Sequence, residues 1–143
     1  MNIEDTFKIQ ELIPRFANSF DTKDWDILKD CLADSVYTDY TDLRGTPPET
    51  ISAAAYVKSR QESLQHLTTH HLSGNYEIQY ADTLQATCRA SMIIWRKSGD
   101  AQFTTHCVYM FRLKKINSEW KIAGITQKVL WNEGNPAIHR TTK

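Results

Sequence analysis

The second half of the chain consists of long β-rich segments that are separated only by short turn sequences. Four such segments can be delimited, at residues 70–80, 84–97, 101–115 and 120–132. The breaks between them carry turn-forming residues, including Ser-Gly-Asp at 98–100 and Asn-Ser-Glu at 117–119. Strands joined by such short turns must pair antiparallel. Because these strands exceed the usual length of about five or six residues, and long strands twist and curl, we expect a curved antiparallel sheet.

The first half of the chain shows the periodicity of helices instead. Apolar residues recur at helical intervals between residues 6 and 20, which predicts one amphipathic helix. Pro14 lies inside this pattern and should kink the helix or mark its true start. Asp24 suits the N-cap of a short second helix. Residues 35–42 then alternate like a strand, and a third helix is expected from about Ser52.

Helices followed by an antiparallel sheet indicate an α+β fold, with the N-terminal helices packed on one face of the sheet. A curled sheet that is closed by helices forms a cone with a pocket inside. The length of 143 residues suits a single domain, 1–143, that buries a core without disulfides or metals.

The balance of charge argues against nucleic-acid binding, since 17 Lys and Arg residues face 17 Asp and Glu residues without a basic stripe. No apolar run reaches the roughly 18 residues of a membrane-spanning helix, and the polar N-terminus lacks the pattern of a signal segment. Cys31, Cys88 and Cys107 have no CxxC spacing, which indicates reduced thiols and a cytoplasmic location. We therefore expect a small molecule as the partner, with no nucleic acid and no membrane.

Three blocks of sequence resemble the scytalone dehydratase family. Residues 19–26 (SFDTKDWD) resemble its SYDSKDWD-type signature, and residues 67–74 (LTTHHLSG) resemble its TQHFIGG-type stretch. Residues 114–124 (KKINSEWKIAG) resemble its KKIDGVWKFAG stretch, and a matching tryptophan follows at Trp131. The chain is thus similar to the SnoaL-like branch of the nuclear transport factor 2-like superfamily. The resemblance implies a cone-shaped α+β fold, which hosts dehydratases, isomerases, cyclases and binding proteins alike.

The resemblance also implies three site residues, Asp21, Tyr40 and His71. Dehydration or isomerisation beside a carbonyl needs one group to remove a proton and another to assist the departing oxygen. His71 would be the acid or base, Asp21 would orient a partner or abstract a proton, and Tyr40 would polarise the carbonyl through a water. Structural explanations remain open for each of them: Asp21 as a helix cap, His71 as a buried structural histidine, and Tyr40 as core packing.

Several positions depart from the family pattern. Met92 occupies the position of the family's second catalytic histidine, and a thioether cannot transfer a proton. Phe20 replaces a tyrosine, while Cys107 and Tyr109 replace a serine and an asparagine. These changes argue against the scytalone reaction itself. Residues 134–143 are polar and are not expected to form the family's apolar lid helix, so the pocket should be open or closed by a neighbouring subunit.

Strand alternation predicts which side chains face the pocket, because successive residues point to opposite faces of a sheet. The inward set expected to bind substrate comprises Met92, Cys107, Tyr109, Ile125, Gln127 and Val129, together with Phe20 from the preceding helix. The outward set comprises Trp95, His106, Val108 and Met110. The predicted pocket is mainly apolar, and this combination is typical of a small-molecule site.

Glu62, His66 and His70 are spaced like metal ligands on a helix. The helix is expected to end near Leu67, which would break that alignment, so we expect no metal. The overall prediction is a cofactor-free lyase or isomerase of dehydratase type that acts on a hydrophobic oxygenated cyclic substrate. The alternatives are a non-catalytic ligand-binding or accessory protein, or a structural subunit like those of ring-hydroxylating dioxygenases. The outward apolar residues favour a homo-oligomer, a dimer or trimer.

Overall fold

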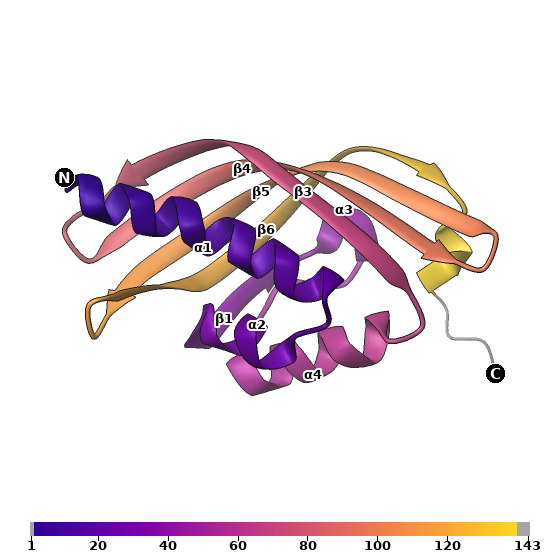
Figure 1. Ribbon diagram of the computed structural model, residues 1–143, viewed down its shortest axis with the longest axis horizontal. Helices are drawn as coiled ribbons and strands as arrows, with labels where there is room; N and C mark the ends of the chain where they lie inside the picture. The colour runs from indigo at the N-terminus through magenta and orange to yellow at the C-terminus, as the bar shows by residue number, and fades with distance from the viewer. Residues whose placement is uncertain (1, 140–143) are drawn as a thin grey trace.

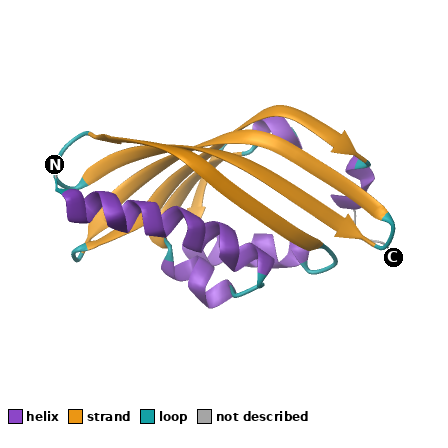
Figure 2. Ribbon diagram, turned by 45° about the horizontal axis from the view of Figure 1, so that its top comes forward, coloured by secondary structure: helices purple, strands orange, loops and turns teal. Residues whose placement is uncertain are grey.

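A computed structural model describes residues 2–139 and shows helices on the concave side of a strongly curved sheet (Figures 1 and 2). The helices are α1 (Ile3–Asp21), α2 (Trp25–Asp30), α3 (Thr41–Arg44), α4 (Ala53–Leu64) and the 3-10 turn η1 (Pro136–His139). The strands are β1 (Leu32–Asp39), β2 (Glu49–Ser52), β3 (Thr68–Tyr80), β4 (Gln85–Ser98), β5 (Ala101–Ile116) and β6 (Glu119–Gly134). This arrangement confirms the predicted α+β fold.

The six strands form one sheet in the order β2-β1-β6-β5-β4-β3. The four long strands pair antiparallel along the chain, as predicted, and their ends lie within two residues of the predicted bounds. The turn between β5 and β6 has Asn117 and Ser118 at φ of 51° and 67°, a left-handed conformation whose twist suits a tight hairpin.

The expectation of an entirely antiparallel sheet is wrong for one pair of strands. β1 lies parallel to β6, with Tyr37 beside Gly124 and Thr38 beside Ile125. The two strands are separated by most of the chain, so no local turn sequence fixes their direction. The sheet is therefore mixed.

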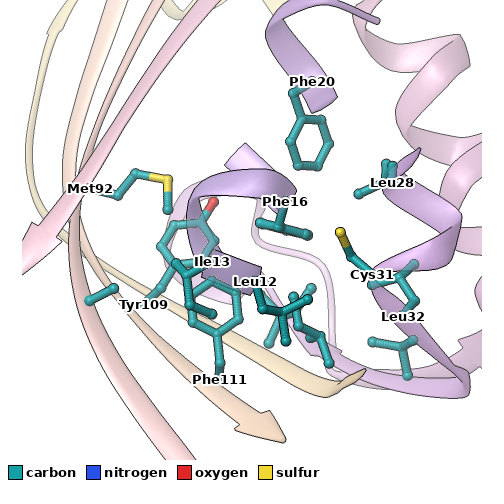
Figure 3. Packing of buried hydrophobic residues seen from close by; sticks show 14 of the residues in the cluster. Leu12, Ile13, Phe16, Phe20, Leu28, Cys31, Leu32, Met92, Tyr109 and Phe111 are labelled. Carbon is teal, nitrogen blue, oxygen red and sulfur yellow. The ribbon is translucent and has the colours of Figure 1, made fainter. Parts of the chain in front are cut away.

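Helix α1 begins earlier than predicted, because Asn2 caps it by accepting a hydrogen bond from the backbone N–H of Glu4 at 2.8 Å. The helix continues through Pro14, which therefore does not mark its start. Its apolar face is buried on the sheet, where the Phe16 ring meets the edge of Phe111 at a centroid distance of 5.4 Å (Figure 3). Each large apolar side chain buried in this way contributes about 1.5–3 kcal/mol, so the several on this face together outweigh the roughly 3 kcal/mol that a proline costs inside a helix.

Two short elements were missed between the second and third predicted helices. α3 occupies Thr41–Arg44, where the alternation had predicted the end of a strand, and the edge strand β2 occupies Glu49–Ser52. The third predicted helix is confirmed as α4, with the hydroxyl of Ser52 accepting a hydrogen bond from the N–H of Ala55 at 3.1 Å. α3 carries Leu43 and Arg44, which line the cavity described below.

The predicted alternation of the long strands is confirmed. Five of the predicted inward residues on these strands are buried, namely Met92, Cys107, Tyr109, Ile125 and Gln127, while Val129 is half-buried. On the opposite face Trp95 and Met110 are exposed, and His106 stacks on Trp131 with ring centroids 4.0 Å apart. Within residues 2–139, no helix combines the length and apolar character needed to cross a bilayer.

Candidate active site

Asp21 and His71 form a hydrogen-bonded pair that joins the end of α1 to strand β3. Oδ1 of Asp21 lies 2.6 Å from Nδ1 of His71. The same carboxylate accepts a hydrogen bond from the backbone N–H of His71 at 2.7 Å and one from the hydroxyl of Thr69 at 2.9 Å. Three contacts therefore hold the carboxylate against the imidazole, and both side chains are largely buried, with 16% and 7% exposed.

Helix capping does not account for Asp21. The residue that caps α2 is Asp24, whose Oδ1 accepts a hydrogen bond from the N–H of Ile27 at 3.2 Å. Asp21 is the last residue of α1, and its side chain turns to β3 instead. The two acidic residues thus have separate roles.

The imidazole of His71 is held on two sides. The ring of Phe20 stacks on it at a centroid distance of 5.1 Å, and the Asp21 carboxylate accepts a hydrogen bond from the N–H group at Nδ1. This tautomer leaves Nε2 as the free basic atom of the ring. His71 lines an inner cavity of about 30 Å³. The other lining residues are Phe20, Tyr40, Leu43, Arg44, Arg60, Leu64, Thr69, Ile94, Arg96, Tyr109 and Gln127.

Tyr40 lies in this cavity as one member of a group of hydroxyls. Its hydroxyl is 2.7 Å from that of Tyr56 on α4, and its ring meets the ring of Tyr109 edge-on at 6.4 Å. Nε2 of Gln127 donates to the Tyr109 hydroxyl at 3.3 Å. Burial raises the pKa of Tyr56 and of Tyr109 well above the ordinary value, so both phenols remain protonated and able to donate.

The predicted substrate-binding residues divide into two groups. Phe20, Tyr109 and Gln127 line the inner cavity. Met92, Cys107 and Ile125 belong to the hydrophobic core instead, where Met92 is 1% exposed and points toward the aromatic side chains of the core (Figure 3). Val129 is half-buried and does not line the cavity.

The cavity is more polar than predicted, because three arginines line it. None of the three was predicted from the sequence. Arg44 comes from α3, Arg60 from α4 and Arg96 from β4. Arg96 could have been found from the alternation, because it follows Met92 and Ile94 on the same face of β4. The other two could not, since they reach the cavity from helices whose packing no local pattern reveals.

Within the described residues the C-terminal segment forms a single 3-10 turn, η1, and not the apolar lid helix of the family, but this turn packs against β4 and β5. Ile138 in η1 is buried, and its carbonyl accepts a hydrogen bond from Nε2 of His66 at 2.9 Å. η1 also forms one wall of an outer cleft of about 590 Å³, lined by Leu43, Arg44, Ser63, Phe103, Asn132, Gly134, Pro136 and His139. Residues 140–143 of the predicted segment lie outside the described residues.

Leu43 and Arg44 line both the inner cavity and the outer cleft, so they form the partition between the two. The pKa of His139 on the far wall is lowered to about 4, mainly by burial and further by Arg96 and Arg44. His139 is therefore neutral at physiological pH, and the positive charge of the site resides on the arginines.

Glu62, His66 and His70, whose spacing resembles that of metal ligands on a helix, do not lie on one helix. α4 ends at Leu64, as the predicted break near Leu67 requires, and His70 lies on β3. Among residues 2–139 no cluster of three His, Cys, Asp or Glu side chains is placed to hold a metal ion.

Comparison with known proteins gives relatives along nearly the whole chain. A scytalone dehydratase of Colletotrichum orbiculare is 26% identical over 93% of this chain and 77% of its own. A scytalone dehydratase-like protein of Passalora fulva is 25% identical over 91% of this chain and 88% of its own. Among solved structures, the Kfla4162 protein of Kribbella flavida superimposes with a TM-score of 0.90 at 21% identity, covering 96% of this chain and 98% of that one.

The family that matches this chain agrees with the observed fold and with the family that the three sequence blocks resemble. The model of the SnoaL-like domain matches residues 1–126, which is most of the chain. The chain therefore belongs to the SnoaL-like domain family.

Proposed function

We propose that the protein is a small lyase or isomerase of dehydratase type, in which the Asp21–His71 pair supplies the acid/base group. The observation that carries the proposal is the 2.6 Å contact between Oδ1 of Asp21 and Nδ1 of His71, which leaves Nε2 free at the cavity. A carboxylate that holds an imidazole in this way stabilises the imidazolium form once a proton arrives on Nε2. The relatives named as scytalone dehydratases support a dehydration.

The reaction needs a proton to move twice. Nε2 of His71 takes the proton from the carbon beside the substrate carbonyl, and the electron pair of that C–H bond forms the new C–C π bond. The C–O bond at the next carbon breaks, and the leaving hydroxyl departs as water after receiving a proton. Because Met92 stands where the family has its second histidine, we propose that the same imidazole returns the proton to the hydroxyl.

In this proposal Tyr40 polarises the carbonyl during the same step. Its hydroxyl lies against that of Tyr56, which is buried and protonated, so Tyr56 can donate to Tyr40 while Tyr40 donates to the substrate. A chain of two hydroxyls stabilises negative charge on the carbonyl oxygen better than one alone.

A ligand-binding protein without catalysis is the second candidate. Met92 favours it, because its thioether lies in the hydrophobic core and leaves the inner cavity with a single imidazole. In that case the protein would bind oxygenated ring compounds and release them unchanged.

The experiment that separates the two candidates is an elimination assay on a panel of cyclic β-hydroxy ketones, read from the absorbance of the conjugated enone. We expect turnover by the wild-type protein and a loss of about 10²–10⁴-fold in His71→Gln. The matched control is His70→Gln, which changes the neighbouring residue on the exposed face of β3 and should keep full activity.

A wild-type protein that binds these ketones but neither releases water nor exchanges their α-protons with D2O would contradict the lyase. That result would support the ligand-binding protein. Equal turnover by wild type and His71→Gln would contradict the assigned role of His71.

A further inference from the structure

Three arginines converge on the cavity that contains His71. Arg60 and Arg96 are 8% and 5% exposed, and Arg44 lies beside them at the partition between the cavity and the outer cleft. Arg44 and Arg60 also line a second outer cleft of about 270 Å³. Both of these outer clefts therefore have a guanidinium group in their walls.

The contacts of Arg44 and Arg60 are with neutral groups. The guanidinium carbons lie 5.2 Å and 5.5 Å from the centre of the Tyr40 ring, and that of Arg60 lies 5.7 Å from the Tyr56 ring. Arg60 also donates to the hydroxyl of Ser59 at 3.1 Å. Aromatic faces and a hydroxyl offset part of the cost of burying these charges but supply no negative charge.

Arg96 has the same kind of surroundings. It donates to the hydroxyl of Thr105 at 2.8 Å, and its guanidinium carbon lies 5.4 Å from the centre of the Phe103 ring. Its pKa is lowered to about 10, mainly by burial and also by the nearby charge of Arg44, yet it remains charged at physiological pH.

None of the ion pairs within residues 2–139 involves these three arginines. Glu49 lines the second outer cleft but forms no ion pair with Arg44 or Arg60. The Nε atoms of Arg44 and Arg60 are buried without a hydrogen-bond partner. Buried guanidinium groups normally have an anionic partner, since desolvation of an unpaired charge is costly. The cavity therefore has donors and positive charge in excess.

We propose that the protein binds a small ring compound bearing a carboxylate, and that Arg44, Arg60 and Arg96 bind that carboxylate where the outer cleft meets the inner cavity. A guanidinium fork matches the two oxygens of a carboxylate, and Arg44 is placed to pair with it on entry from the outer cleft. The ring of the ligand then lies in the outer cleft of about 590 Å³, and only its carboxylate reaches past the partition, because the inner cavity of about 30 Å³ has no room for a ring. As the substrate class of the proposed lyase, this assignment rests on the proposed function, but carboxylate binding requires no turnover.

Calorimetric titration with 2-naphthoate and with the neutral amide 2-naphthamide tests the proposal. The two probes share size and ring system and differ in charge. We expect naphthoate to bind at least about 10-fold more tightly, because a charge-assisted bidentate pair is stronger than a neutral contact. Naphthoate affinity should fall at least about 10-fold in Arg60→Gln and in Arg44→Gln. Arg89→Gln is the control, because Arg89 is an exposed residue of β4 outside the cavity.

Three results would overturn the proposal: equal affinity for the two probes, undiminished naphthoate binding in both cavity variants, or an equal loss in Arg89→Gln. Inorganic phosphate serves as a competitor, and displacement of naphthoate by phosphate supports a shared anion site. If the protein binds phosphate but shows no preference for naphthoate over naphthamide, the proposal that its ligand is an organic carboxylate is wrong. If Arg60→Gln fails to fold, Arg60→Lys replaces it, since lysine keeps the charge but loses the fork and should still weaken binding.

The His71→Gln variant separates this inference from the proposed function. We expect it to lose turnover but to keep the preference for naphthoate over naphthamide, because the arginines and not His71 supply the charge that distinguishes the two probes. If hydroxy ketones that bear a carboxylate also fail to react while naphthoate binds selectively, the carboxylate assignment stands and the lyase does not. If turnover occurs without any preference for naphthoate, the carboxylate assignment is overturned alone.

Discussion

Oδ1 of Asp21 lies 2.6 Å from Nδ1 of His71, although the two residues are 50 positions apart in the chain. Helix α1 ends at Asp21 where β3 begins its course along the sheet, and two further hydrogen bonds from β3 hold the carboxylate in place. The fold therefore builds an oriented imidazole from the end of a helix and the face of a strand.

Asp21→Asn should lose activity and part of the stability, because the amide nitrogen cannot accept the hydrogen bond that Oδ2 accepts from the N–H of His71. An amide keeps the size of the carboxylate but removes the charge that stabilises the imidazolium, so we expect a loss of about 10²–10⁴-fold in kcat. The matched control is Asp24→Asn, because asparagine caps a helix about as well as aspartate and should leave both activity and stability unchanged. Normal turnover by Asp21→Asn would reduce the pair to a structural contact.

Tyr40→Phe should destabilise the protein by about 1–3 kcal/mol, because it leaves the buried hydroxyl of Tyr56 without its partner at 2.7 Å. The double variant Tyr40→Phe/Tyr56→Phe should cost less than the sum of the two single changes, since no orphaned hydroxyl remains. Urea unfolding of the four proteins measures this. Strict additivity of the free energies of unfolding would show that the two hydroxyls do not interact.

Alkaline pH should weaken the fold through its three buried thiols. Burial raises the pKa of Cys31, Cys88 and Cys107 from an ordinary 9.0 to about 11 each. Between these values the unfolded chain loses protons that the native protein keeps, so the stabilising contribution is complete below pH 9 and falls as pH rises toward 11.

Urea unfolding at pH 8, 9 and 10 measures this loss, which should approach about 1.4 kcal/mol per pH unit for each thiol. In Cys31→Ala the slope should be smaller by up to that amount, because one thiol is absent. A free energy of unfolding that is constant from pH 8 to pH 10 would contradict the assigned burial of the thiols.

The exposed apolar face of the sheet should bind a second copy of the chain. Trp95 and Met110 lie on the side that none of the helices described within residues 2–139 covers, and Trp131 is 51% exposed beside His106. We expect light scattering to give a dimer or trimer of the 16.5 kDa chain, and Met110→Lys to shift it toward the monomer. Ile3→Lys, at the exposed start of α1, is the control. A monomer at every protein concentration would contradict this surface.

The long strands were the most predictable part of the fold, because alternation and turn residues are local signals. The alternation of apolar residues assigned Tyr109 and Gln127 to the inner face of the sheet, and both side chains are buried there. α3 and β2 were missed because four residues are too few for either helical or strand periodicity to appear. The parallel pairing of β1 with β6 depends on contacts across most of the chain, which no short pattern records.

The site was less predictable than the fold. The resemblance to a family supplied Asp21, Tyr40 and His71, and all three lie at one cavity or in contact with it. It could not supply Arg44 and Arg60, because their position depends on how α3 and α4 pack at the mouth of the cone. Charge on a helix normally indicates a solvated face, and only the packed structure shows these arginines turned inward.

The tautomer of His71 is the most direct test of the central claim. A long-range ¹⁵N–¹H correlation spectrum of the imidazole at pH 8 identifies which ring nitrogen carries the proton. We predict that the wild-type imidazole carries its proton on Nδ1 and has a free Nε2. In Asp21→Asn the population of this tautomer should fall. Binding of a ring ligand should shift the Nε2 signal. An Nε2–H form of His71 that neither Asp21→Asn nor any ligand alters would contradict the account.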